Sequence, residues 1–172
     1  MIKKIMHNNK GVTLMELLIV LALIAILSGL AGLSLSMINS SSVDKAAVML
    51  NSSIEKGRYA AMAKGAAHGT INVTKAGETN IRIDGVKEEM LANKSVQVWF
   101  SASTAVVENT GAMTPFSSTN ITFKSNGMVD TIFGAPASPA RIYEIAFKKG
   151  NKVSAVVIYP ATGKSRTIGW YE

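Results

Sequence analysis

The feature that most constrains this chain is an uncharged, largely apolar run at residues 17–43. A helix of that length extends about 40 Å, which exceeds the roughly 30 Å hydrocarbon core of a bilayer. Lys3, Lys4 and Lys10 precede the run, and an excess of Lys on one flank places that flank in the cytoplasm. The run therefore predicts a membrane-spanning helix, with the N-terminus of the chain in the cytoplasm.

Glu16 stands directly before this run. A carboxylate in hydrocarbon costs about 3 kcal/mol even on lenient insertion scales, so its position calls for a cationic or hydrogen-bonding partner. A cleaved secretory signal would explain the basic start and the small residues 28–32, but such signals rarely carry an acid there. A plain single-span anchor fits the length and gives Glu16 no role.

The stretch KGVTLMELLIVLALIAILSGLA, residues 10–31, resembles the class III signal of type IV pilins and type II secretion pseudopilins. In that family a prepilin peptidase cuts after a leader Gly, the new N-terminal residue is N-methylated, and the fifth mature residue is Glu. By this resemblance residues 1–11 are the cleaved leader, ending at Gly11, and Val12 is the new terminus and methylation site. Glu16 then falls at the fifth mature position. Val12 stands where the family more usually has Phe. This departure concerns the methylation of Val12 and does not affect cleavage after Gly11.

The resemblance implies a mechanical role for the apolar helix. Subunits of this family are stored in the cytoplasmic membrane and extracted at an inner-membrane assembly platform. They then pack with other pilins or pseudopilins into an extracellular or periplasmic filament. Cleavage leaves a positive amine at Val12, and the amine of a neighbouring subunit is a partner for Glu16 in a medium of low dielectric constant. We therefore assign filament assembly to Glu16.

Beyond the apolar run, a helical pattern continues with one apolar face. Its apolar positions are Val43, Ala46, Ala47, Leu50, Ile54, Ala61 and Met62. We expect one helix over residues 12–66, in which Gly57 weakens the pattern. Its second half would cover the core of a globular head that comprises residues 41–172.

After residue 69 the pattern changes to alternation, which predicts strands. The alternating runs are TINVTK, TNIRID, SVQVWF, NITFK, MVDTIF, RIYEIAF, KVSAVVIY and SRTIGW. Turn residues at Gly77 and at Asn126-Gly127 predict tight hairpins. Residues 134–140 read as a loop, and residues 101–119 as the most mobile loop. Seven or so antiparallel strands favour two small sheets, and hence an α+β fold: a long N-terminal helix packed on an antiparallel β-sheet or β-sandwich head.

Three segments of the head resemble the GspH/FimT branch of minor pseudopilins. They are the helix end at Arg58, a Phe-x-x-x-Gly hairpin through Phe123 and Gly127, and a Gly-basic-x-Arg hairpin at residues 163–166. This resemblance implies the pilin fold and a minor, tip-initiating subunit of a pilus or of a secretion pseudopilus. A major-type pilin without the usual C-terminal disulfide is the alternative within the family.

The sequence offers no catalytic constellation. The chain has no cysteine and two histidines, of which His7 lies in the leader, so neither a thiol nucleophile nor a His/Cys metal site is expected. Gly163-Lys164-Ser165 lacks the first Gly of a P-loop and leads into a strand. We therefore expect no enzymatic activity, no metal and no cofactor.

The remaining candidate site is electropositive. Removing the three leader lysines from 18 basic residues leaves 15 against 11 acidic ones, or a net charge of +4. The basic candidates are Lys148, Lys149, Lys152, Lys164 and Arg166. Such side chains near Trp170 and Tyr171 suit phosphates and stacked bases, and in FimT-like proteins the Gly-basic-x-Arg element is linked to DNA capture. A solvated basic rim, a DNA-binding minor pilin for natural competence, and an exported β-domain with an ordinary signal peptide stay open as alternatives.

Overall fold

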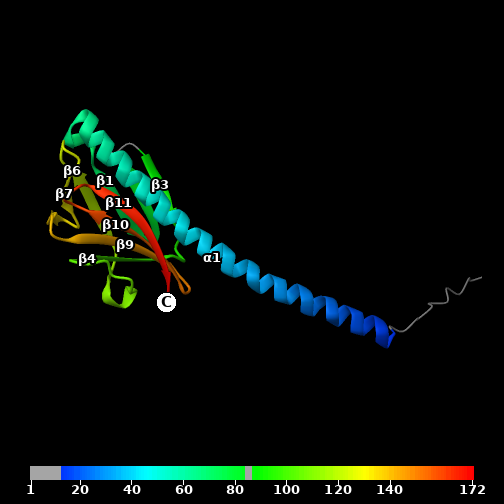
Figure 1. The fold of residues 1–172 in the computed structure, drawn as a ribbon. Helices are drawn as coiled ribbons and strands as arrows, with labels where there is room; N and C mark the ends of the chain where they lie inside the picture. The colour runs from blue at the N-terminus through cyan, green and yellow to red at the C-terminus, as the bar shows by residue number, and fades with distance from the viewer. Residues whose placement is uncertain (1–12, 84–86) are drawn as a thin grey trace, which may run out of the picture. The chain divides into compact units, whose positions relative to one another are not determined.

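The computed structural model describes residues 13–83 and 87–172, with side chains outside residues 29–40, 87 and 88. The chain divides into two units, with the boundary in the sequence between Ile38 and Asn39. One helix, α1 (Leu14–Lys64), belongs to both units (Figure 1). The prediction of one long helix is thus confirmed, and α1 ends at Lys64, two residues before the predicted end.

In the first unit, the large apolar side chains of residues 14–27 are 49–82% exposed. They lie on every side of α1, which is why no single face of this half could be buried against a core. Among the residues that the structure describes, no helical segment is both long and apolar enough to cross a membrane.

In the second unit, α1 packs one face against the sheets. Val43, Leu50 and Ile54 are fully buried there, as the helical pattern predicted. Met62 is 47% exposed, so its predicted place in the core was wrong. Gly57 does more than weaken the pattern, because a Cβ at this position would lie 2.6 Å from Cδ1 of Ile71. The missing side chain lets α1 approach the first strand closely.

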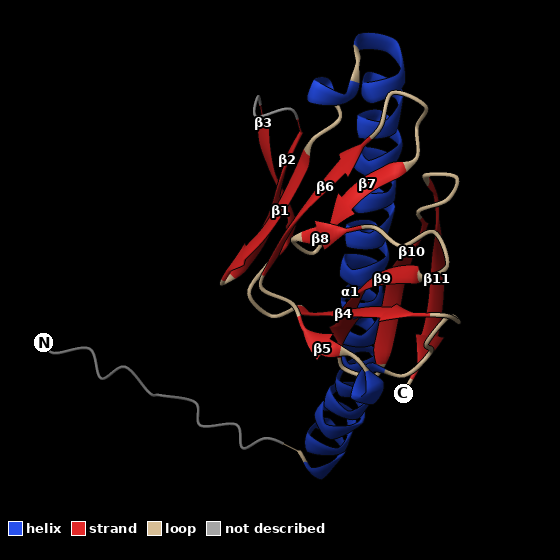
Figure 2. Cartoon of the chain, turned by 90° about the vertical axis from the view of Figure 1, so that its left-hand side faces the viewer, coloured by secondary structure: helices blue, strands red, loops and turns tan. Residues whose placement is uncertain are grey.

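Two antiparallel sheets form the rest of the head (Figures 1 and 2). The six-stranded sheet runs, in spatial order, β3 (Lys87–Ala92), β2 (Glu78–Ile83), β1 (Ile71–Ala76), β6 (Ser118–Phe123), β7 (Val129–Ile132) and β8 (Ala135–Pro136). The five-stranded sheet runs β11 (Lys164–Tyr171), β10 (Lys152–Tyr159), β9 (Ile142–Lys149), β4 (Gln97–Ser103) and β5 (Thr114–Pro115). The fold is therefore α+β, with a helix on two antiparallel sheets, and is consistent with the pilin fold.

Local turn chemistry predicted the hairpins correctly. Gly77 (φ 88°) joins β1 to β2, and Gly127 (φ 82°) lies between β6 and β7. The alternation missed β3, β5 and β8, all of which lie at sheet edges. Edge strands tolerate charges and proline. The charged sequence KEEMLA of β3 and the prolines of β5 and β8 therefore lack the alternation that predicts a strand.

Residues 104–113, here called the strap, fold over the outer face of the five-stranded sheet. The strap contains the short helix η2 (Thr110–Ala112), and its Met113 is 7% exposed. Beneath it lies a second small core of Ala146, Val153 and Ala155, flanked by Trp99, Val107, Ile168 and Trp170. The expectation of one loop over residues 101–119 was therefore wrong for much of that segment, because its packing residues are far apart in the sequence.

Candidate functional site

Thr13 caps the N-terminus of α1. Its Oγ1 accepts a hydrogen bond of 3.2 Å from the backbone N–H of Glu16, and its carbonyl accepts from the N–H of Leu17 at 3.1 Å. Thr-x-x-Glu is the spacing of a capping box, and a carboxylate in the first turn interacts favourably with the helix dipole. Gly11 and Val12 lie outside the described residues.

The five basic candidates do not form one patch. Lys149 pairs with Lys152 across the β9–β10 turn, and Lys148 pairs with Val153 just beyond it. At the other end of β10, Tyr159 pairs with Lys164 and Val157 with Arg166. The two ends of β10 are about 23 Å apart at 3.3 Å per residue. The structure thus separates the lysines of the β9–β10 turn from the cations of β11.

Two of the turn lysines are engaged with carboxylates. Lys148 Nζ forms an ion pair with Glu172 and donates to Thr110 Oγ1 at 3.2 Å. Lys152 Nζ lies 3.7 Å from Asp44 Oδ1 and 4.7 Å from the centroid of the Tyr171 ring. These contacts reduce the positive potential near the β9–β10 turn. The opposite end of β10, near the β10–β11 turn, is therefore the stronger candidate for an anionic ligand.

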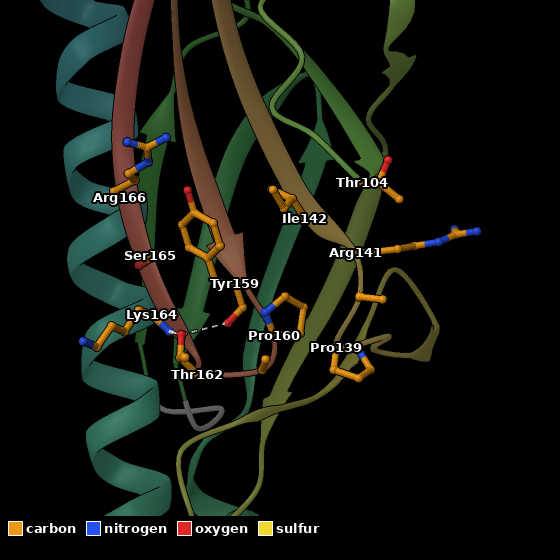
Figure 3. Close-up of a pocket in the computed structure, with 12 residues that line it drawn as sticks. Thr104, Pro139, Arg141, Ile142, Tyr159, Pro160, Thr162, Lys164, Ser165 and Arg166 are labelled. Atoms are coloured by element: carbon orange, nitrogen blue, oxygen red, sulfur yellow. Dashed lines mark hydrogen bonds between the residues drawn. The ribbon is translucent and has the colours of Figure 1, made fainter.

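The Tyr159 pocket lies beside that second group of cations. It has a volume of about 580 Å³ and includes Tyr159, Lys164 and Arg166 in its lining, with Arg141 at the far side. Figure 3 shows Arg166 beside the Tyr159 ring, while Lys164 and Arg141 point outwards on opposite sides. The Arg166 Cζ atom is 5.9 Å from the ring centroid, within the range of a cation–π contact. The pocket therefore combines an aromatic face with one cation beside it, Arg166, and two cations at its rim, Lys164 and Arg141.

Sequence reasoning missed Arg141 and Tyr159. Arg141 ends the loop before β9, and Tyr159 ends β10. Neither carries a motif of its own, and they line one pocket because the start of β9 lies beside the end of β10. The turn that follows Tyr159 was a visible signal, since Gly163 has a φ of 64° that favours glycine.

Two carboxylates hold the strap. Glu144 on β9 is fully buried and accepts 2.9 Å from Val107 N and 3.2 Å from the Ser101 hydroxyl. Burial raises the pKa of the Glu144 carboxyl, against the lowering effect of these hydrogen bonds. At the other end of the strap, hydrogen bonds from Lys148 and Thr110 lower the pKa of Glu172 to about 2. The strap is therefore held by two carboxylates. Its surroundings disfavour the charged form of Glu144 and favour the charged form of Glu172.

These opposite pKa shifts predict opposite pH dependences. The folded pKa of Glu172 lies below its ordinary 4.5, so its contribution to stability is present above pH 4.5 and is lost as pH falls towards 2. Glu172→Gln should therefore be less stable than the wild type at pH 7, and the difference should disappear near pH 2. Urea unfolding at a series of pH values, followed by tryptophan fluorescence, measures this difference.

Glu144→Gln is expected to show the reverse dependence. The pKa of Glu144 is raised in the folded state, so the contribution of Glu144 to stability is complete below pH 4.5. This contribution is lost as pH rises through the folded pKa. The stability of Glu144→Gln relative to the wild type should increase with pH above 4.5. A stability difference that does not change with pH in either variant would contradict this account of the two carboxylates.

A junction of three segments joins α1 to both sheets. Arg58 Nε donates to the carbonyl of Gly127 at 3.3 Å, and a Cβ on Gly163 would lie 1.7 Å from that same oxygen. A backbone hydrogen bond of 3.1 Å from Val129 N to Pro160 O lies alongside. Arg58, Gly127 and Gly163 come from the three segments that resemble the GspH/FimT branch, so the structure gives these separate motifs one packing role.

Of the comparisons with known proteins, one matches the N-terminal segment. A family profile described as the prokaryotic N-terminal methylation motif matches residues 6–32. No curated protein and no solved structure matched the chain. The matched residues contain Gly11, Val12 and Glu16, the positions at which cleavage, methylation and assembly are predicted. The chain therefore carries, at residues 6–32, the prokaryotic N-terminal methylation motif that is typical of type IV pilins and pseudopilins.

Proposed function

We propose that this chain is a structural subunit of a type IV pilus or a type II secretion pseudopilus. The methylation motif at residues 6–32 carries the proposal. The exposed apolar side chains of residues 14–27 support it, because an apolar surface of this size requires lipid or other subunits as a cover. The role is mechanical, and the proposal includes no catalytic step.

The proposed processing divides the chain into three parts. Prepilin peptidase removes residues 1–11, residues 12–40 serve as a single-pass membrane helix and later as filament core, and residues 41–172 form the head. The subunit waits in the cytoplasmic membrane with its N-terminus inside. An inner-membrane assembly platform then moves it into a periplasmic or extracellular filament, where Glu16 pairs with the terminal amine of a neighbour.

A minor role in the filament follows from the GspH/FimT resemblance, whose motif residues Arg58, Gly127 and Gly163 lie together in the head. Quantitative mass spectrometry of sheared, purified filaments tests both levels of the proposal. We expect the processed subunit in the filament fraction at a few copies per filament. Stoichiometric abundance would contradict the minor role, and absence from the filament fraction would contradict the function itself.

The second candidate function is DNA binding for natural competence. The Tyr159 pocket favours it, because an aromatic face flanked by Arg166, Lys164 and Arg141 suits stacked bases and phosphates. The lysines of the β9–β10 turn suit it less well, since Glu172 and Asp44 engage two of them. We therefore propose that DNA contacts the head near the β10–β11 turn.

Exchanging Lys164 and Arg166 together for Ala is expected to weaken DNA binding and to flatten the slope of log K against log salt by about 1.5. The matched control is Lys149→Ala with Lys152→Ala, which removes the same charge from the other end of β10 and should leave most of the binding. Electrophoretic mobility shifts over a salt series measure both effects. Equal losses in the two double variants, or no wild-type binding at low salt, would contradict DNA capture in this pocket.

A further inference from the structure

The outer face of the six-stranded sheet carries a cluster of amide side chains. The register pairs Asn72 of β1 with Asn120 of β6 on one side and with Arg82 of β2 on the other. Two residues further along β1, Thr74 pairs with Asn80. These strands lie side by side in Figure 2, and the neighbouring positions Ile71 and Val73 on β1 face the core. The cluster therefore lies on the face turned away from the core.

This cluster contradicts the preferences of the strands that carry it. Asn is depleted in strands, and β-branched or aromatic residues fit a solvent-facing row better, on a scale that spans about 1 kcal/mol per position. Here Asn72, Asn80 and Asn120 occupy three adjacent strands near one another. Local conflicts of this kind are expected at functional sites, where the side chains serve a ligand rather than the fold.

The cluster surrounds a hollow of about 260 Å³, lined by Asn72, Thr74, Asn80, Ile81, Arg82 and Asn120. The Asn72 Oδ1 atom is buried and has no hydrogen-bond partner among the described residues. An unmet acceptor of this kind costs about 1–3 kcal/mol. Rotation of the Asn72 amide towards the hollow would let a ligand that donates a hydrogen bond recover this cost on binding.

We propose that this hollow, here called the amide hollow, binds one sugar unit of a glycan. Each Asn side chain offers a donor and an acceptor, which matches a hydroxyl group that both donates and accepts. The hollow is smaller than the roughly 300–1,000 Å³ of sites for drug-sized ligands, which favours a single ring over an extended chain. This inference goes beyond the proposed function, because it concerns what the head recognises and does not depend on assembly.

Other ligand classes fit the amide hollow less well. An apolar ligand would leave the amides unpaired, and a phosphate-rich ligand would meet a single cation, Arg82, in the lining. No carboxylate is among the described residues that line it, which disfavours a divalent cation. A peptide strand cannot add to the backbone here, because β1 already pairs with β2 and β6.

The test uses the full chain, purified in a detergent without a sugar headgroup. The probes are soluble oligosaccharides of glucose, galactose, N-acetylglucosamine and galacturonate, arrayed first and then titrated by calorimetry. We expect at least one of these oligosaccharides to bind. Asn72→Ala and Asn120→Ala should each weaken that binding by about tenfold or more, the loss of one or two hydrogen bonds. Asn120 is exposed, so the second variant keeps the fold intact.

Asn151→Ala is the control, because Asn151 is an exposed residue in the β9–β10 turn of the other sheet. It should bind as the wild type does. The proposal is overturned if no oligosaccharide of the panel binds, or if binding is unchanged in both Asn72→Ala and Asn120→Ala. Binding of unstructured peptides in place of sugars, lost in the same variants, would overturn it as well. None of these outcomes depends on whether the chain enters a filament.

Discussion

Gly163→Ala is expected to destabilise the head by about 3 kcal/mol or more. A side chain at φ 64° costs about 1 kcal/mol, and the new Cβ would lie 1.7 Å from the carbonyl oxygen of Gly127. The contact is with backbone, so no rotamer change relieves it, and the β10–β11 turn must move away from Arg58 and Gly127. Thermal unfolding followed by tryptophan fluorescence should show a decrease in Tm of about 10 °C.

Gly150→Ala is the matched control for this prediction. Gly150 has nearly the same φ, 61°, and, apart from its two chain neighbours, no described residue has an atom within 4 Å of the Cβ that Ala would add. Gly150→Ala should therefore show only the conformational cost of about 1 kcal/mol. Equal decreases in Tm for the two variants would contradict the close contact between the two turns. The fluorescence reports on the head because Trp99 and Trp170 both lie in the five-stranded sheet.

Glu16→Leu is expected to remove the subunit from filaments. In the proposed assembly, the variant leaves the terminal amine of a neighbour unpaired in a core of low dielectric constant. Removing one partner of a buried ion pair costs about 3–5 kcal/mol, so the amount of subunit in the filament fraction should fall by roughly tenfold or more. Immunoblots of sheared filaments against total membrane measure the ratio.

The cap at Thr13 makes this variant selective. The hydrogen bond to Thr13 Oγ1 comes from the backbone N–H of residue 16, which Leu keeps. Glu16→Leu thus removes the carboxylate without removing the cap. Met15→Leu, next to it in the exposed apolar segment, should assemble normally. Normal levels of Glu16→Leu in filaments would contradict the assembly role of Glu16.

Much of the fold follows from local sequence rules. The bounds of α1, the turns at Gly77 and Gly127 and the buried face at Val43, Leu50 and Ile54 all depend on residues within a few positions of one another. Edge strands such as β3 were not predicted, because a strand that is paired on one side only can carry charges and need not alternate. The packing role of Gly57 was not predicted, since it depends on Ile71, which lies in another element.

The candidate sites depended on pairings that the sequence does not reveal. The basic residues 148–152 and 164–166 are close in the chain, and only the register along β10 separates them. Conversely, Asn72 and Asn120 are far apart in the chain and meet because β1 pairs with β6. The burial of Glu144 likewise depends on the strap, which packs on the far face of β9. Motif reading thus succeeded at the contiguous N-terminal segment.

The central claim is that the N-terminal segment is processed for filament assembly, and the N-terminus of the mature protein tests it most directly. Intact-mass measurement and fragmentation of the protein from native membranes should show a chain that begins at Val12 and carries one methyl group on its terminal amine. A chain that keeps residues 1–11, or that begins within residues 28–32 or later, would contradict the account.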